Sequence, residues 1–283
     1  MRIALLGHSH LACVKAAWRS DVHEAAFLGA TAGHGGLTRA WRRADSGTAI
    51  ELADDAHPTQ RLLWNLCCGD NPRFSLAGFD AIVFVGVLFS ACPWHLSHCS
   101  VGADVSALGG AGVAPISFAQ WRAMYGASAR IEVQRFLVDL VRGPATAGRP
   151  LLSLVQPGPR ADAAEFDARY ATPPAWTALP DALKAALVAN ERALVDRLGA
   201  ELGVRVVHPP MKTLVDGYLC RVDYSSGALG SRNLGGGVPQ YGDDPREHPL
   251  NINHKNRDYG AVLVEQIHRC LDGRSPEFDP DAP

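Results

Sequence analysis

Residues 81–87, AIVFVGV, carry the clearest strand pattern in this chain. The run is apolar throughout and rich in β-branched side chains, which is typical of a strand covered on both faces. Four other short apolar runs are strand candidates, and together with residues 81–87 they predict a five-stranded sheet. The four runs are residues 3–6, 25–28, 151–155 and 204–207.

Helical patterns alternate with these strands. The strongest covers residues 181–202, where leucines recur at intervals of three or four residues or their multiples. We expect Asp181 to cap its start, and Gly203 fits the position just after its end. Further helices are expected over residues 11–18 and 256–271. This alternation predicts an α/β fold in which a mostly parallel sheet has helices on both faces.

Two long segments, residues 31–72 and 89–120, interrupt this pattern. Loops of that length in a compact domain are usually functional or partly helical. Both segments leave from the carboxyl ends of predicted strands, where parallel α/β sheets bind their ligands. We therefore expect one domain over residues 1–273 with two loop excursions near its site, and a flexible tail over residues 274–283.

The composition excludes several classes of protein. The 27 basic and 29 acidic residues give a net charge of −2, whereas a nucleic-acid-binding protein usually has a basic surface. No run approaches the ~20 apolar residues of a membrane span, and the N-terminal apolar run is too short for a secretion signal. The seven cysteines are odd in number and irregularly spaced, which favours buried free thiols over a disulfide framework. We expect a cytoplasmic protein.

The turn after the first predicted strand reads Gly7-His8-Ser9-His10. Ser9 falls at the start of a predicted helix, where unsatisfied N–H groups and the helix dipole favour negative charge. An oxyanion formed by attack of Ser9 on a carbonyl would have the amide of Ser9 itself as a donor. Serine is also a preferred N-cap residue. This turn alone does not decide between a nucleophile and a cap.

A second segment, residues 251–260, favours the nucleophile. It reads NINHKNRDYG and places His254 just before the last predicted helix. The opening strand with its Gly7–Ser9 turn and this closing segment together resemble the first and last signature blocks of the SGNH/GDSL hydrolase superfamily. Residues 204–226 are similar to the penultimate region of its bacterial members.

The resemblance implies a flavodoxin-like three-layer sandwich of the SGNH-hydrolase type around a central, mostly parallel five-stranded sheet. It also implies a Ser–His–Asp triad in which Ser9 is the nucleophile and His254 the general base. Imidazole suits that role because its ordinary pKa is close to neutrality.

Asn251 stands where the family usually has the triad aspartate. An amide cannot stabilise an imidazolium by charge, and in a serine protease the corresponding change lowers kcat by about 10⁴. Three outcomes remain open. A backbone carbonyl orients His254, or a nearby carboxylate replaces the aspartate, or the triad is degraded. The candidate carboxylates are Asp243, Asp244 and Glu247.

The oxyanion hole also departs from the family pattern. Family members carry an asparagine shortly after the third strand, whereas here that strand continues through Gly86 with no amide side chain. Loss of one such donor typically costs about 10²–10³ in kcat. The family's second block supplies a glycine N–H, and Gly35 is the candidate for it. Gly86 is the second candidate oxyanion residue.

A cluster of cysteine and histidine between residues 92 and 99 offers a different site. Cys92, His95, His98 and Cys99 are of the residue types that bind zinc, but their spacing fits no structural zinc pattern. A loop lining the substrate site is the favoured interpretation. We expect no metal and no cofactor, because dinucleotide and Walker A motifs are also missing.

The leading hypothesis is an esterase or acyl hydrolase that acts on a small acyl ester of a sugar or metabolite through an acyl-enzyme on Ser9. The partner is then a small molecule, with no nucleic acid and no membrane. Two alternatives stay open. One is a binding or accessory protein that keeps the fold and has lost catalysis. The other is an O-acyltransferase that uses the same serine and histidine.

Overall fold

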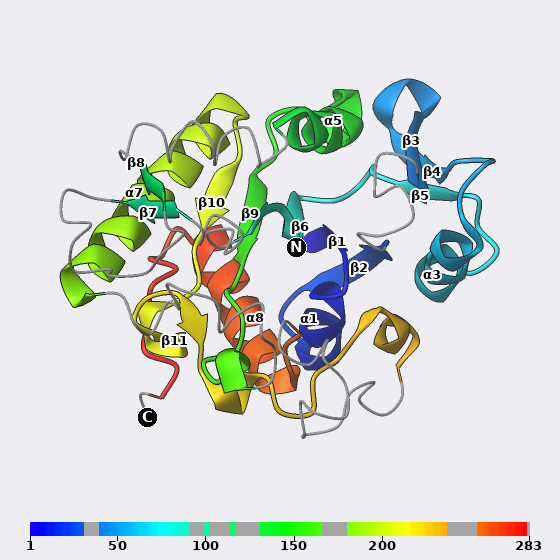
Figure 1. Cartoon of the computed structure of the whole chain (residues 1–283). Coiled ribbons are helices and arrows are strands. Elements are labelled where there is room, and N and C mark those ends of the chain that lie inside the picture. Colours follow the sequence, from blue (N-terminus) through cyan, green and yellow to red (C-terminus); the bar gives the residue numbers. More distant parts are fainter. Residues whose placement is uncertain are drawn as a thin grey trace.

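A computed structural model describes residues 1–30, 40–90, 99–101, 114–116, 131–165, 180–236 and 254–281. At its centre lies a five-stranded sheet in which every pairing is parallel (Figure 1). The five predicted strands are confirmed as the strands of this sheet. In the order of the sheet they are β10 (Arg205–Val207), β9 (Leu151–Gln156), β6 (Ala81–Ser90), β1 (Arg2–Gly7) and β2 (Glu24–Gly29).

The strand order places the topological switch point of the sheet beside β1. The chain enters the sheet at β1, adds β2 on one side, and then adds β6, β9 and β10 in turn on the other. This order reverses direction between β1 and β6. Ligands of doubly wound sheets bind at such a switch point, beyond the carboxyl ends of the strands. The fold therefore directs attention to the residues that follow Gly7 and Val85.

Successive side chains of β1 enter two separate hydrophobic clusters, because side chains alternate between the faces of a strand. Ile3 and Leu5 pack on one face, and Ala4 and Leu6 on the other, all without solvent exposure. Both faces of the sheet are thus covered, which explains why the strands are continuous apolar runs.

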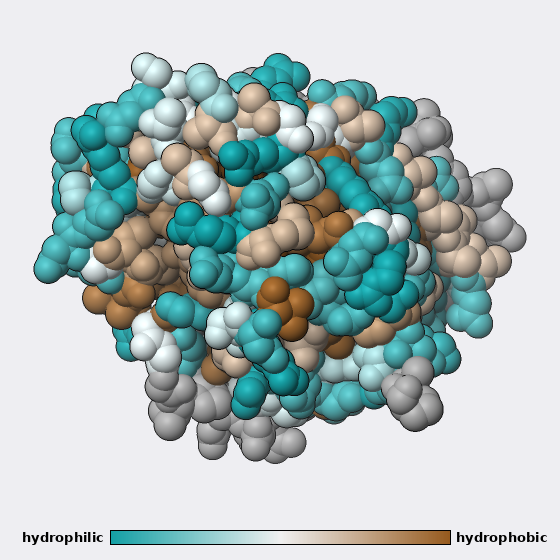
Figure 2. All heavy atoms as spheres, turned by 180° about the vertical axis from the view of Figure 1, so that it is seen from behind, coloured by the Kyte–Doolittle hydropathy of each residue, from teal (hydrophilic) through white to brown (hydrophobic). Residues whose placement is uncertain are grey.

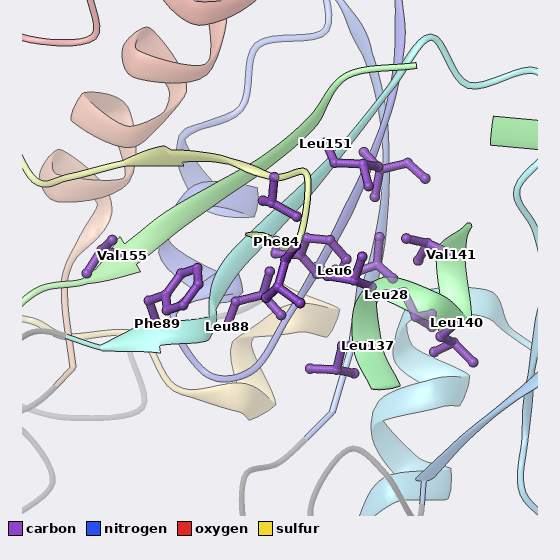
Figure 3. Close-up of a cluster of buried hydrophobic side chains, with 14 of the residues drawn as sticks. Leu6, Leu28, Phe84, Leu88, Phe89, Leu137, Leu140, Val141, Leu151 and Val155 are labelled. Atoms are coloured by element: carbon purple, nitrogen blue, oxygen red, sulfur yellow. The ribbon is translucent and has the colours of Figure 1, made fainter. Parts of the chain in front are cut away.

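Helices form a layer on each face of the sheet. Helices α1 (Leu11–Ala17) and α8 (Arg257–Leu271) pack on one face, and α5 (Ile131–Val141) and α7 (Asp181–Glu201) on the other (Figure 1). Side chains of α5 meet the sheet in a cluster that includes Phe84 (Figure 3). The protein is therefore an α/β fold with a central parallel sheet between two helical layers.

Helices α1 and α8 approach each other closely. A Cβ atom on Gly260 would lie 2.0 Å from the carbonyl oxygen of Cys13, so only glycine fits at this crossing. The contact joins the two ends of the chain. It brings the residues just before α8 close to the turn that precedes α1.

The ends of α7 differ in part from expectation. Asp181 does not cap the helix, because Pro180 occupies the N-cap position and no side chain caps the helix there. Asp181 is the first helical residue, where its carboxylate pairs with Lys184 at 3.3 Å. Gly203 follows the helix with φ +61°, as predicted. The N–H groups of Gly203 and Val204 bond back to Ala200 and Gly199, which completes a Schellman motif.

The long excursions contain regular structure of their own. Residues 40–75 form a small antiparallel sheet of β3 (Trp41–Ala44), β4 (Ala49–Leu52) and β5 (Arg73–Ser75), with α3 (Pro58–Cys68) between β4 and β5. Four further short strands lie outside these sheets. They are the parallel pair β7 (Cys99–Val101) and β8 (Ala114–Ile116), and the hairpin β11 (Leu214–Val215) and β12 (Leu219–Cys220).

Single 3₁₀ turns complete the described chain. They are η1 (Asp45–Gly47), η4 (Pro144–Thr146), η5 (Ala163–Glu165), η7 (Met211–Thr213), η8 (Val222–Tyr224) and η9 (Ser231–Gly235). None of the helices in the described part of the chain is long and apolar enough to cross a membrane. The face opposite to the view of Figure 1 is mainly hydrophilic, with hydrophobic residues gathered in a few patches (Figure 2).

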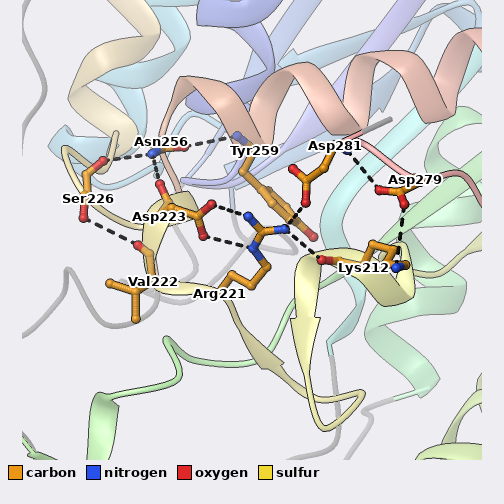
Figure 4. A network of polar contacts seen from close by, with 9 residues as sticks. All are labelled: Lys212, Arg221, Val222, Asp223, Ser226, Asn256, Tyr259, Asp279 and Asp281. Carbon is orange, nitrogen blue, oxygen red and sulfur yellow. Dashed lines mark hydrogen bonds and ion pairs between the residues drawn. The ribbon is translucent and has the colours of Figure 1, made fainter. Parts of the chain in front are cut away.

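The C-terminal residues, for which the sequence predicts a flexible tail, contact the body of the protein as far as Asp281. Arg221 bonds to the carboxylates of Asp223 and Asp281, and Lys212 lies 3.7 Å from Asp279 (Figure 4). The five cysteines whose side chains the structure describes are free thiols, and Cys13, Cys220 and Cys270 among them are buried.

Candidate active site

Ser9 lies in the turn between β1 and α1, at the carboxyl end of a central strand. The N-cap of α1 is His10, and no side chain caps this helix. The hydroxyl of Ser9 instead lies 3.3 Å from Nδ1 of His8. The interpretation of Ser9 as an N-cap is therefore wrong. Its hydroxyl is part of a polar contact at the switch point of the sheet.

His8 joins this serine to two neighbouring strands. Its ring is hydrogen-bonded to the backbone of Gly86 in β6 and to the side chain of Gln156, the last residue of β9. Burial lowers the pKa of His8 to about 4, while the bond to Gly86 opposes this shift, His254 adds to it and Gln156 opposes it. His8 is therefore a neutral imidazole near pH 7.

Gly86 has no side chain at the place where the rings of His8 and His10 pack against its backbone. It has φ +66°, and the pairing of β6 with β9 becomes irregular just after Val85. A Cβ atom on Gly86 would lie 3.3 Å from Cε1 of His8 and 3.5 Å from Cδ2 of His10. Gly86, a predicted oxyanion residue, thus lies at the site and supports both rings.

His10 and His254 extend the cluster to the other end of the chain. Their rings are nearly parallel, with centroids 6.0 Å apart, and the ring of His8 meets that of His10 edge-on at 5.2 Å. His10 is buried, and its Nδ1 has no hydrogen-bond partner within the residues that the structure describes. Burial, followed by the charges of His8, His254 and Lys255, holds the pKa of His10 well below its ordinary value.

Lys255, the residue after His254, anchors this segment through buried contacts. Lys255 is only 1% exposed, and its carbonyl accepts a bond from the N–H of Leu229 at 3.0 Å. Its ammonium group lies 3.2 Å from the hydroxyl of Ser225, which is fully buried. Burial lowers the pKa of Lys255, and the neighbouring thiols of Cys220 and Cys13 oppose that shift.

Asn256 anchors the same segment to the start of helix α8. Its Oδ1 accepts the N–H groups of Asp258 and Tyr259, each at 3.1 Å, and so caps α8. Its amide nitrogen donates to the carbonyls of Asp223 at 2.6 Å and Ser226 at 3.0 Å (Figure 4). All four possible bonds of the amide are made. His254, two residues earlier, is held at a rigid point of the fold.

The structure therefore brings Ser9, Gly86 and His254 to one place, and His8, His10 and Gln156 join them. The sequence analysis did not select His8 and Gln156 as site residues. Gln156 carried a usable signal, because it directly follows the predicted strand of residues 151–155 on the side where ligands bind. The remaining candidates lie outside the described residues or in side chains that the structure leaves undescribed. They are Gly35, Cys92, His95, His98, Cys99, Asp243, Asp244, Glu247 and Asn251.

The described part of the site combines a serine hydroxyl with three imidazole rings. Over residues 1–30, 40–90 and the other described ranges, no three histidine, cysteine or acidic residues are arranged to hold a metal ion. What the site offers is a serine hydroxyl 3.3 Å from Nδ1 of His8, with the imidazoles of His10 and His254 next to it. No protein-family model, curated protein or solved structure matches this chain.

Proposed function

We propose that this protein is a serine-dependent acyl hydrolase of the SGNH type, with a small acyl ester of a sugar or metabolite as its substrate. The observation that carries the proposal is the position of Ser9. It follows the central strand β1 at the switch point, its hydroxyl touches an imidazole, and His254 stacks on the neighbouring His10. A serine with several imidazoles beside it at the switch point of a parallel sheet is the kind of site that supports acyl transfer, and we assign the base to His254 and not to the contacting His8.

In this mechanism Ser9 attacks the ester carbonyl and its proton passes to His254. The imidazolium of His254 then returns the proton to the departing alkoxide, which leaves an acyl group on Ser9. A water molecule, deprotonated by the same imidazole, attacks that acyl group and releases the acid, and the proton returns to Ser9. Backbone N–H groups of Ser9, Gly35 and Gly86 are the proposed oxyanion donors.

The pKa values of the other two histidines support His254 as the base. The pKa of His8 is lowered to about 4, and that of His10 lies well below its ordinary value. Such groups accept a proton poorly near neutral pH, where an effective general base has its pKa close to the operating pH. Asn251, Asp243, Asp244 and Glu247 are the proposed partners that orient His254.

The proposal is tested by intact-protein mass measurement after exposure to a fluorophosphonate. We expect one adduct on the wild type, none on Ser9→Ala, and slowed labelling of His254→Ala. Ser20→Ala is the matched control, because Ser20 is an exposed serine soon after α1, and this variant should label like the wild type. Absence of any adduct that depends on Ser9 would contradict the proposal and favour a binding or accessory protein.

A second measurement separates hydrolysis from transfer. A labelled enzyme is an acyl hydrolase if activated esters give free acid as the main product when acceptor alcohols are present. A product in which the acyl group has moved to the added alcohol would assign an O-acyltransferase instead, because the two reactions share the acyl-enzyme and differ in how water is excluded.

A further inference from the structure

Two contacts of the His8 ring bear on which of its nitrogens carries the proton. The backbone of Gly86 and the side chain of Gln156 both oppose the lowering of the pKa of His8. Gly86 faces the Nε2 side of the ring, because its Cβ position lies 3.5 Å from Nε2. A neutral ring carries one proton, and a proton on Nε2, the side that faces Gly86, leaves Nδ1 as an acceptor.

That free acceptor is aimed at the hydroxyl of Ser9, 3.3 Å away. With the proton of the ring on Nε2, Nδ1 has none to give, so the hydroxyl of Ser9 donates and the imidazole accepts. The acceptor is held from three strands at once, because His8 follows β1, Gly86 belongs to β6 and Gln156 ends β9. A side chain fixed in this way keeps its own partner in one position.

We propose that His8 is the positioning residue for the nucleophile, holding the Ser9 oxygen in place through a hydrogen bond accepted at Nδ1. This inference rests on the proposed function of Ser9 and adds a role that the serine–histidine pair does not contain. Rotation about the Cβ–Oγ bond re-aims the hydrogen at His254 without moving the oxygen. His8 therefore fixes the site of attack, and His254 removes the proton.

Three variants of His8 distinguish this role from others, because they keep different parts of the ring. His8→Asn keeps an acceptor oxygen where Nδ1 lies and loses the group that reaches Gly86. His8→Gln reaches the Nε2 position and loses the acceptor for Ser9. His8→Leu loses both. A general base at His8 would tolerate none of the three, since amides do not take up a proton.

The test is the rate of fluorophosphonate labelling at Ser9 in the folded variants. We expect His8→Asn to label within about threefold of the wild type and His8→Gln and His8→Leu about tenfold more slowly, which corresponds to one hydrogen bond. Rescue by glutamine and not by asparagine would show that His8 only supports Gly86 and Gln156. Loss of labelling in all three would make His8 the base. Either result would overturn the positioning role.

Nitrogen NMR of histidine in the wild type and in Ser9→Ala provides a readout that needs no activity. The expected result is a neutral His8 with protonated Nε2, whose Nδ1 resonance shifts when the Ser9 hydroxyl is removed. A protonated Nδ1, or a resonance that Ser9→Ala leaves unchanged, would overturn the proposal even where a variant fails to fold. A wild type that is not labelled at Ser9 would instead remove the proposed function, and the NMR result tells these two failures apart.

Discussion

The imidazole rings of His10 and His254 lie at 11° to each other with their centroids 6.0 Å apart, although they come from opposite ends of the chain. Their pairing follows from the packing of α1 against α8, in which Gly260 lies directly on the backbone of Cys13. His10 precedes α1 and His254 precedes α8. The same helix contact therefore brings His254, the proposed base, beside the turn that carries Ser9, the proposed nucleophile.

The stacking predicts that His10 acts through the shape of its ring. His10→Phe keeps an aromatic ring against His254 and removes a buried nitrogen with no partner among the described residues, so we expect stability within about 1 kcal/mol of the wild type. His10→Ala leaves a cavity and should lose about 2–4 kcal/mol. Denaturant unfolding measures both. Equal losses in the two variants would show that the ring nitrogens of His10 are needed.

Gly86 and Gly148 form a matched pair for testing how the turn is supported. Both have positive φ, +66° and +72°, but a Cβ atom meets the two histidine rings only at Gly86, while Gly148 faces open space. An L-residue in this region costs about 1–2 kcal/mol at either position. Gly86→Ala should lose more than Gly148→Ala and should also slow labelling of Ser9. Similar effects on stability and labelling would mean that the rings adapt to the extra methyl group.

The sheet was predictable because its strands are covered on both faces. Such strands are continuous apolar runs that differ clearly from turns, and all five were found in this way. The small sheet of β3, β4 and β5 was not predicted. Its first strand reads Trp-Arg-Arg-Ala, and the exposed Arg42 and Arg43 give it no apolar pattern. Short strands of this kind form only because neighbouring segments pair with them.

For the candidate site, the sequence singled out Ser9 and His254, and in the structure both lie next to His10. Ser9 and His254 stand at places that the alternation of strands and helices marks out, but the sequence does not show where a side chain in a turn points. For this reason the sequence analysis did not select His8, and its 3.3 Å contact with Ser9 is seen only in the structure. The prediction that Asp181 caps α7 is wrong, because the preceding residue, Pro180, occupies the N-cap position.

The buried histidines predict that the protein loses stability in mild acid. The unfolded chain takes up protons near the ordinary histidine pKa of about 6.5, whereas folded His8 does so only near pH 4. Between these values the unfolded state binds more protons, so the free energy of unfolding falls as the pH falls, by up to about 3 kcal/mol for His8 alone. Denaturant unfolding between pH 7 and pH 4 measures this slope. It should be shallower in His8→Asn, and an unchanged slope would contradict the assignment.

Asn256 predicts a large loss of stability from a small substitution. Asn256→Ala removes the cap of α8 and leaves the carbonyls of Asp223 and Ser226 without their donor, so we expect a loss of about 2 kcal/mol or more. Labelling of Ser9 should also slow, because His254 precedes this cap. Arg257→Ala is the control, since Arg257 is exposed and should change stability by less than about 0.5 kcal/mol. Thermal unfolding compares the two variants, and equal behaviour would rule out the anchoring role.

Substitution of Lys255 is expected to have the opposite effect on stability from Asn256→Ala, because burial of the Lys255 ammonium group costs folding free energy. Burial lowers its pKa below the ordinary value, so between the folded and unfolded pKa values the unfolded chain binds more protons. Wild-type stability should therefore rise with pH toward about 10.4, the ordinary lysine value. Lys255→Met fills similar space without a charge. We expect it to be at least as stable as the wild type at pH 7, with an advantage that shrinks as the pH approaches 10.

Lys212 provides the control for this measurement, because Lys212→Met removes a charge from a side chain that is 67% exposed. Its stability difference from the wild type should show no such dependence on alkaline pH. Unfolding in denaturant at pH 7, 8.5 and 10 compares the three proteins. A loss of about 3–5 kcal/mol in Lys255→Met at every pH would show instead that the ammonium is charged and paired inside the fold. In that case the bond to Ser225 and the nearby thiols would stabilise the segment that carries His254.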